Sequence, residues 1–148
     1  MVSALRRGGR GVSILLQAGD YPRILTASVY GGGYRQQPTA RILVMRSHPQ
    51  GYQPGYFQAW YDHLAPPPAL LRAYRQQALD WHAFAYAYLC ELERMPRLAI
   101  RADLARWLLT YDTVTLLCCE HAPFGDELLV KCHRRLLRAW LVDDDITF

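Results

Sequence analysis

The sequence predicts an α/β fold in which helices cover a small, mostly parallel sheet within a single domain. Three short runs that are apolar or rich in β-branched residues have the length and composition of strands. Several segments with the apolar spacing of amphipathic helices lie between the second and third runs, and another follows the third. Strands that alternate with helices are typical of parallel sheets. The 148 residues, 51% of them hydrophobic, are enough to enclose one core.

We expect three parts along the chain: a loose arm over residues 1–22, one α/β domain over 23–142, and an acidic tail over 143–148. The arm is rich in glycine, proline and serine, which interrupt regular structure. The tail begins with three consecutive aspartates, a pattern typical of a solvated segment.

The first expected strand is RILTASVY, residues 23–30, because apolar and polar residues alternate there and β-branched residues recur. Three glycines and a proline make residues 31–40 a loop. RILVMRS (41–47) and TVTLLCC (113–119) are nearly continuous apolar runs, the pattern of strands buried on both faces. In parallel sheets ligands bind at the carboxyl ends of strands, so we expect a site where these runs end.

Five segments have helical patterns, and the third and fifth carry the clearest apolar stripes. Asp80 is a suitable N-cap for the third, because its carboxylate can accept a hydrogen bond from the first turn. A triple proline after the first segment is expected to end it. In order along the chain, the predicted helices are residues 56–64, 69–79, 81–95, 97–111 and 133–142.

The composition favours a soluble protein with a modest preference for anionic partners. Lysine plus arginine number 17 against 13 acidic residues, for a net charge of +4, and Lys131 is the one lysine. Arginine suits phosphate and carboxylate, although a GC-rich genome favours it too. No apolar run is long enough for a membrane span, and the N-terminus lacks the pattern of a signal peptide. We predict a cytoplasmic protein, no membrane association, and four reduced cysteines.

Residues 116–141 gather most of the side chains capable of chemistry, including three of the four cysteines. Cys132 and His133 lie at the expected start of the last helix, where backbone N–H groups and the helix dipole favour anions. That environment lowers a thiol pKa, but buried inert cysteines are common. Cys118 and Cys119 are neighbours on a strand, so we expect them to face opposite sides, with Glu120 on the side of Cys118.

A metal site made from Cys118, Cys132 and His133, with Glu120 or His121 added, is an alternative to which we give little weight. Structural zinc sites usually have paired, closely spaced ligands, which the sequence lacks. We therefore predict neither a metal nor a cofactor. No phosphate-loop, dinucleotide-binding, zinc-protease or nucleophile-elbow motif is present. Aromatic residues over 52–61 could stack on bases, although such clusters more often pack beneath a loop.

The stretch LLCCE followed by CHRRLLRAWL resembles the signature of the domain of unknown function 488 family, in which L-L-C-x-E ends a strand and C-H-R opens the last helix. RILVMRSHP and HLAPPPALLRAY are similar to other parts of that family, so the resemblance spans about residues 24–142. It implies a fold and a site but no reaction. The positions shared with the family are Arg46, Cys118, Glu120, Cys132, His133 and Arg134.

One departure from the family lies between Glu120 and Cys132, where the connecting segment is about twice as long as the family's usual linker, whose length is normal for α/β units. Its additional residues could form a lid or reshape the pocket. Within the site, we expect Cys118, Glu120 and Cys132 to be catalytic. The expected substrate-binding residues are Arg46, His133 and Arg134.

Two functions remain open. The first is an enzyme that acts on a phosphate-bearing substrate such as a nucleotide or nucleic acid, with a cysteine thiolate as nucleophile and Glu120 moving a proton. The second is a non-catalytic module that binds nucleic acid or protein, in which the cysteines, Glu120 and the arginines only pack and hydrogen-bond. A purely structural ion pair of Glu120 with Arg134 or Arg46 is compatible with either.

Overall fold

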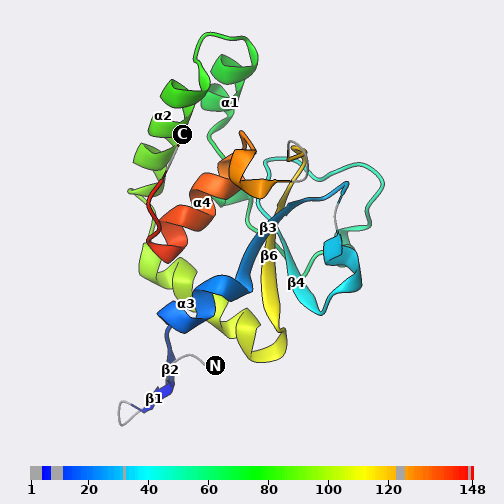
Figure 1. Ribbon diagram of the computed structural model, residues 1–148, viewed down its shortest axis with the longest axis vertical. Helices are drawn as coiled ribbons and strands as arrows, with labels where there is room; N and C mark the ends of the chain where they lie inside the picture. Colours follow the sequence, from blue (N-terminus) through cyan, green and yellow to red (C-terminus); the bar gives the residue numbers. More distant parts are fainter. Residues whose placement is uncertain (1–4, 8–11, 32, 123–125, 147) are drawn as a thin grey trace.

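Figure 1 shows the fold in the computed structural model, which describes residues 5–7, 12–31, 33–122, 126–146 and 148. Four parallel strands form one sheet in the order β3-β6-β4-β5. The bounds of these strands are Ile24–Ser28 for β3, Thr39–Leu43 for β4, Ala59–Trp60 for β5 and Thr113–Cys118 for β6. The parallel sheet with its helices confirms the predicted fold class.

The strand that comes last in the sequence lies in the interior of the sheet. Leu116 of β6 pairs with Thr26 of β3 on one side and with Ile42 of β4 on the other. The composition explains this position, because a strand paired on both edges and covered on both faces needs apolar side chains throughout. Its end, and therefore Cys118, is held by both neighbouring strands.

Four α-helices follow the predicted periodicity. Their bounds are Pro68–Arg75 for α1, Trp81–Leu92 for α2, Arg97–Thr110 for α3 and His133–Val142 for α4. The side chain of Asp80 accepts a hydrogen bond of 2.8 Å from the backbone N–H of Ala83, so the predicted N-cap of α2 is confirmed. Helix α4 lies across β3 and β6 and packs against α2 (Figure 1).

The two faces of the sheet are covered differently. The helices enclose the main core on one face, to which Leu116 contributes. The next residue, Leu117, points to the other face, where Tyr34 and Phe57 from the connections around β4 pack on it. Alternation along the strand therefore gives one face to helices and the other to aromatic residues from connecting segments.

The predicted helix over 56–64 is wrong. That region consists of two short 3-10 helices, Pro54–Tyr56 and Asp62–Leu64, with β5 between them. The backbone N–H groups of Gln58 and Tyr61 donate to carbonyls of β4, at 2.9 Å and 2.8 Å. Pairing with the neighbouring strand satisfies these groups, so the segment gains more from extending the sheet than from a short helix between prolines.

The described residues near both ends of the chain form regular structure or contacts. Within the expected arm, β1 (Leu5–Arg7) and β2 (Val12–Ile14) pair as an antiparallel hairpin, while residues 1–4 and 8–11 lie outside the described residues. In the expected acidic tail, Asp143 forms an ion pair of 2.6 Å with Arg97. None of the described helices has the length and apolar character needed to cross a bilayer.

Candidate functional site

The carboxyl ends of β4 and β6 meet the first turn of α4, and side chains capable of chemistry gather at this junction. Cys118 ends β6, and Val44 follows the last residue of β4. Cys132 is the N-cap residue of α4 and His133 is its first helical residue. Because neighbouring parallel strands end at the same edge of the sheet, α4 delivers its first turn to both ends at once.

His133 is held in one orientation. Its Nε2 lies 2.6 Å from the carbonyl oxygen of Val44, and since a carbonyl can only accept, Nε2 donates the hydrogen bond. The edge of the ring packs against Tyr88, whose hydroxyl donates to the carbonyl of Leu64 at 2.6 Å. The second ring nitrogen, Nδ1, is therefore the atom that His133 presents to the site.

Two cysteine sulfurs contact that nitrogen. The Sγ of Cys132 lies 3.8 Å from Nδ1 and the Sγ of Cys118 lies 3.9 Å from it. These three atoms lie within 4.8 Å of one another, and all three residues are buried. Two thiols and an imidazole so arranged can exchange a proton, or can share a metal ion.

The two thiols differ in their acidity. Burial opposes ionisation of Cys132, but a hydrogen bond from Cys118 and the charges of His133 and Arg134 outweigh it and hold its pKa well below the usual range. Hydrogen bonds with Cys119 and Cys132, together with burial, raise the pKa of Cys118 well above the usual range. The negative charge of the pair therefore rests on Cys132, while Cys118 keeps its proton.

The negative charge on Cys132 also shifts the pKa of His133. Burial alone would lower its pKa, but the charge of Cys132 and the hydrogen bonds to Cys132 and Val44 raise it above the usual value. The contacts therefore favour a negative sulfur on Cys132 beside a more basic His133, with the less acidic thiol of Cys118 in contact. Placing Cys132 at the N-terminus of α4 supports this state, because the helix dipole favours a negative sulfur there.

The side chain of Arg134 is buried, and each of its three guanidinium nitrogens donates a hydrogen bond within the protein. Its Nε and NH2 donate to the two carboxylate oxygens of Glu127, at 3.0 Å and 2.8 Å. Its NH1 donates to the backbone carbonyl of Glu120 at 2.6 Å. The side chain is 0% exposed. These bonds tie the first turn of α4 to the segment that connects it with β6, whatever ligand the site takes.

A cavity of about 260 Å³ opens above Cys118 and His133, and we call it the arginine cavity. Three arginines line it: Arg46 from the segment after β4, and Arg72 and Arg75 from α1. Glu120 is the acidic residue among the lining side chains, so the cavity is net positive. A neighbouring cavity of about 480 Å³ reaches Cys132 and shares Arg75, Glu120 and His133 with it.

Arg46 is positioned but not saturated. Its NH2 donates to the carbonyls of Ala65 and Pro66, at 3.2 Å and 3.0 Å, which fixes the guanidinium beside the cavity. Its Nε is buried and has no hydrogen-bond partner among the described residues. A buried donor without an acceptor is costly, so an anion in the arginine cavity would relieve that cost.

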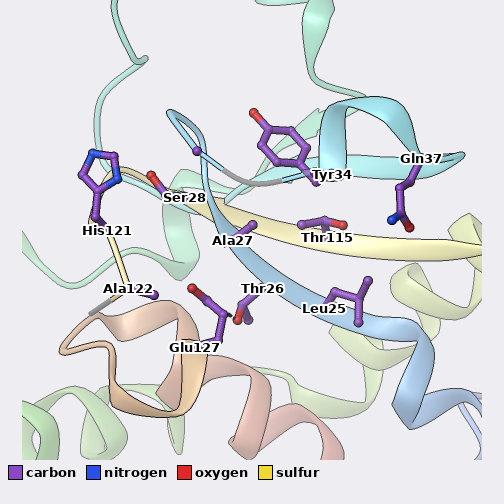
Figure 2. Close-up of a pocket in the computed structure, with 12 residues that line it drawn as sticks. Leu25, Thr26, Ala27, Ser28, Tyr34, Gln37, Thr115, His121, Ala122 and Glu127 are labelled. Carbon is purple, nitrogen blue, oxygen red and sulfur yellow. Dashed lines mark hydrogen bonds between the residues drawn. The ribbon is translucent and has the colours of Figure 1, made fainter. Parts of the chain in front are cut away.

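A third cavity, of about 350 Å³, lies along β3, away from the two sulfurs. Figure 2 shows the hydroxyl-bearing side chains of Thr26, Ser28 and Tyr34 around it, with Glu127 and His121 at its margin. The hydroxyl of Thr26 donates to Glu127, the carboxylate that also holds Arg134. This cavity has no arginine and no cysteine among its lining residues, so its chemistry differs from that of the arginine cavity.

The predicted site residues come together in part. Cys118, Cys132 and His133 converge, with Arg46 and Glu120 at the adjoining cavity. The expectation that Cys118 and Cys119 face opposite sides does not hold, since both line the arginine cavity. The physical reason is that β6 ends at Cys118, so strict alternation stops there.

Several contributors were missed by reasoning from the sequence. The carboxylate that holds Arg134 is that of Glu127, in the long connection, and Glu120 offers only its backbone carbonyl. No periodicity marks Glu127, because it begins a 3-10 helix of only three residues, Glu127–Leu129, which is too short to show one. The spacing of Arg72 and Arg75 is the signal that could have identified them, since residues three apart share one face of a helix.

Comparison with known proteins gives one match. The DUF488-N3a family model, described as the active DUF488-N3 subclade, matches residues 24–145, which is most of the chain and includes both sequence motifs. The predicted resemblance is therefore confirmed. No curated protein and no solved structure matches the chain.

Proposed function

The chain belongs to the DUF488 family, and we propose that it is an enzyme that acts on a phosphate-bearing substrate with a cysteine as nucleophile. One observation carries the proposal: the sulfur of Cys118, in contact with an oriented histidine, faces a cavity lined by three arginines. The arginines supply the affinity for an anion and the cysteine supplies the chemistry.

The charge around the arginine cavity favours a dianion such as a phosphate monoester. Arg46, Arg72 and Arg75 contribute three positive charges, against one negative charge from Glu120. Guanidinium groups match the oxygens of a phosphate in geometry and in charge. Neither Arg72 nor Arg75 forms an ion pair with another described residue, and both are exposed, so they are available to a ligand.

The volume bears on the size of the bound group. About 260 Å³ is below the range of pockets that enclose a whole drug-sized molecule, so the arginine cavity fits a phosphate and the group next to it. The neighbouring cavity of about 480 Å³ shares lining residues with it and can take the remainder of a larger substrate. A nucleotide, or the end of a nucleic acid, has these dimensions.

The reaction would proceed through a covalent intermediate. The sulfur of Cys118 attacks the phosphorus, and an S–P bond forms as the bond to the leaving oxygen breaks. The thiol proton passes to the pair formed by Cys132 and His133, and from there to the leaving oxygen. Water then attacks the phosphorus, the S–P bond breaks, phosphate is released, and the proton lost by that water passes by way of Glu120 to the sulfur of Cys118. Glu120, at the edge of both cavities, is placed to accept the proton of that water.

Cys132 and Arg134, two further residues of the predicted site, have secondary roles in this reaction. Cys132 touches Nδ1 on the side of the neighbouring cavity and is the alternative nucleophile for a substrate that binds there. Arg134 holds the first turn of α4 in place through Glu127 and Glu120. In this arrangement Arg134 is a positioning residue rather than a direct ligand of the substrate.

The test is turnover of p-nitrophenyl phosphate by the reduced protein, followed by a panel of nucleoside monophosphates. We expect Cys118→Ser to lower kcat by about a thousandfold or more, since loss of a nucleophile removes the reaction path. Arg46→Ala should raise KM more than it lowers kcat. Arg106→Ala, an exposed arginine on α3 that pairs with Asp103, serves as the matched control and should leave both constants unchanged.

Two results would contradict the proposal. One is turnover by Cys118→Ser and Cys132→Ser at the level of the unchanged protein. The other is alkylation of both Cys118 and Cys132 in the native protein that is far slower than that of the exposed Cys90, as expected for inert buried thiols. The affinity for inorganic phosphate, measured by calorimetry, separates loss of binding from loss of chemistry.

A non-catalytic module that binds nucleic acid is the second candidate, and a specific surface favours it. Tyr30 and Tyr52 lie with ring centroids 5.9 Å apart, and the guanidinium of Arg35 lies 5.5 Å from the centre of the Tyr52 ring. Aromatic rings beside arginine can stack on bases. Binding of random single-stranded RNA that weakens with salt, in a protein without turnover, would favour this candidate over the enzyme.

A further inference from the structure

We propose that Cys118, Cys132 and His133 form a binding site for a soft divalent metal ion, with Zn²⁺ as the expected occupant. The inference uses side chains of the proposed enzyme site but does not rest on the proposed reaction. Thiolate sulfur and imidazole nitrogen are the donors that zinc prefers in proteins. Hard cations such as Mg²⁺ and Ca²⁺ need oxygen donors, which this cluster does not offer.

The spacing of the three donor atoms suits a tetrahedral ion. With zinc at its usual distances from sulfur and nitrogen, the two ligand atoms are separated by roughly 3.5 Å along the edge of the tetrahedron. The Sγ atoms of Cys132 and Cys118 lie 3.8 Å and 3.9 Å from Nδ1 of His133. The two sulfurs lie within 4.8 Å of each other, against about 3.8 Å when both bind one tetrahedral zinc ion, so a side-chain rotation of up to about 1 Å would bring all three atoms to bonding distance.

The surroundings of His133 are those of a metal ligand. A metal-binding histidine usually donates its other ring N–H to a carbonyl or carboxylate, which fixes the tautomer and the direction of the free nitrogen. Here Nε2 donates to Val44 at 2.6 Å, so Nδ1 is directed at the two sulfurs. The ring of Tyr88 packs edge-on against the imidazole and limits its rotation.

The charges also balance. Two thiolates and a neutral imidazole neutralise one divalent ion, and binding releases the protons that the three groups hold. The nearby guanidinium of Arg134 is already neutralised by Glu127, at 2.8 Å. A zinc ion would therefore leave the buried cluster without net charge, which a site of this burial requires.

Three protein ligands leave the fourth position open. Cys118 and His133 line the arginine cavity, while Cys132 and His133 line the neighbouring one, so water or an anion can reach the ion from a cavity. Zinc sites that serve only structure are usually closed by four protein ligands. Glu120 and His121, the fourth ligands considered from the sequence, are not part of the converging group.

The experiment is a metal titration of the full chain, reduced with a phosphine and freed of metal. Added Co²⁺ should give the thiolate charge-transfer and tetrahedral d–d absorption bands at one equivalent, and Zn²⁺ should abolish them. Cys118→Ser, Cys132→Ser and His133→Ala should each weaken zinc binding by more than the 10–100-fold that loss of an outer-shell partner costs. Cys90→Ser, which removes an exposed cysteine on α2, is the matched control and should bind as the unchanged protein does.

A second measurement needs no variant and so does not depend on whether the substituted chains fold. Alkylation of the unchanged protein, mapped by peptide mass, should be slowed by Zn²⁺ at Cys118 and Cys132 but not at the exposed Cys90. Equal alkylation at all positions with and without Zn²⁺, or no cobalt band at one equivalent, would overturn the proposal. A disulfide between Cys118 and Cys132 in the reduced preparation, found by mass, would also overturn it.

The two proposals fail separately. Metal-free protein that turns over a phosphate ester but binds no zinc would remove the metal site and leave the enzyme. Protein that binds zinc tightly at these three residues but turns over no ester, with or without the metal, would do the reverse. The metal titration reads the ion itself, so neither outcome depends on knowing the natural substrate.

Discussion

Two sets of arginines lie near His133, and they differ in burial and in hydrogen-bond partners, the properties that distinguish a structural arginine from a ligand-binding one. Arg134 is fully buried and its donors are taken by Glu127 and by the carbonyl of Glu120. Arg72 and Arg75 are exposed on α1 at the arginine cavity. All three arginines lie near His133, but their contacts indicate a structural role for Arg134 and a ligand-binding role for Arg72 and Arg75.

Membership of a sequence motif does not by itself show whether an arginine stabilises the fold or binds a ligand. Arg134 belongs to the C-H-R motif and was expected to bind substrate, whereas Arg72 and Arg75 carry no motif. A buried guanidinium must be neutralised within the protein, and that requirement uses its donors. An exposed guanidinium pays no such desolvation and keeps its donors for a ligand.

The largest effect should come from removing the partner of the buried arginine. Glu127→Gln leaves the buried guanidinium of Arg134 beside a neutral amide. Because the side chain of Glu127 is 32% exposed, we expect a loss of about 2–3 kcal/mol of unfolding free energy, below the value for a fully buried pair. Urea unfolding followed by circular dichroism measures it. Glu91→Gln is the matched control, because the Arg94–Glu91 pair is exposed and its loss should cost about 1 kcal/mol or less.

A loss for Glu127→Gln as small as that for Glu91→Gln would break the comparison, because Arg134 would then not depend on its partner. Its donors would be free to turn toward a ligand, as the motif suggested. The same variant also reports on the long connection, since Glu127 lies in the part that departs from the family's usual length.

The fold was largely predictable because its signals are local. The apolar runs ending at residue 47 and residue 119, and the N-cap at Asp80, depend on the residues of one element, and the structure has a strand or helix at each. The site was predictable as far as its motifs reach: Cys118, Cys132 and His133 converge because the carboxyl ends of parallel strands share an edge.

The rest required tertiary contacts that no local pattern encodes. The helix predicted over 56–64 was wrong because backbone N–H groups of that segment pair with β4, and the sequence of the segment does not reveal this pairing. Glu127 was missed because its role depends on how a long connection with only a three-residue 3-10 helix folds back on α4. Cys119 was misplaced because the strand ends one residue before it, and boundaries of elements are the least certain part of a pattern.

The exposed arginines should show the opposite balance of effects. Arg72→Ala and Arg75→Ala should each leave the urea midpoint nearly unchanged and weaken binding of inorganic phosphate by roughly tenfold, the value of one charge-assisted hydrogen bond. Calorimetry measures the affinity. Arg94→Ala, an exposed arginine at the end of α2, is the control, and equal weakening by all three would mean that phosphate responds to net charge alone.

Loss of a neutral buried hydrogen bond should lower the unfolding free energy by an intermediate amount. Tyr88→Phe removes the hydroxyl that donates to Leu64 but keeps the ring against His133. We expect a loss of about 0.5–1.5 kcal/mol of unfolding free energy, smaller than for the buried ion pair because no charge is left unpaired. A loss as large as that of Glu127→Gln would mean that packing around His133, rather than charge, dominates the stability of this region.

The smallest effect should be that of salt, and it separates the two sets of arginines without any substitution. Raising ionic strength screens exposed charges strongly and buried pairs weakly. Phosphate affinity at Arg72 and Arg75 should therefore fall several-fold between low and physiological salt, whereas the stability difference between the unchanged protein and Glu127→Gln should stay nearly constant. If that difference shrinks in parallel with phosphate affinity, water reaches the Arg134–Glu127 pair, and the distinction between a buried supporting arginine and exposed recognising ones no longer holds.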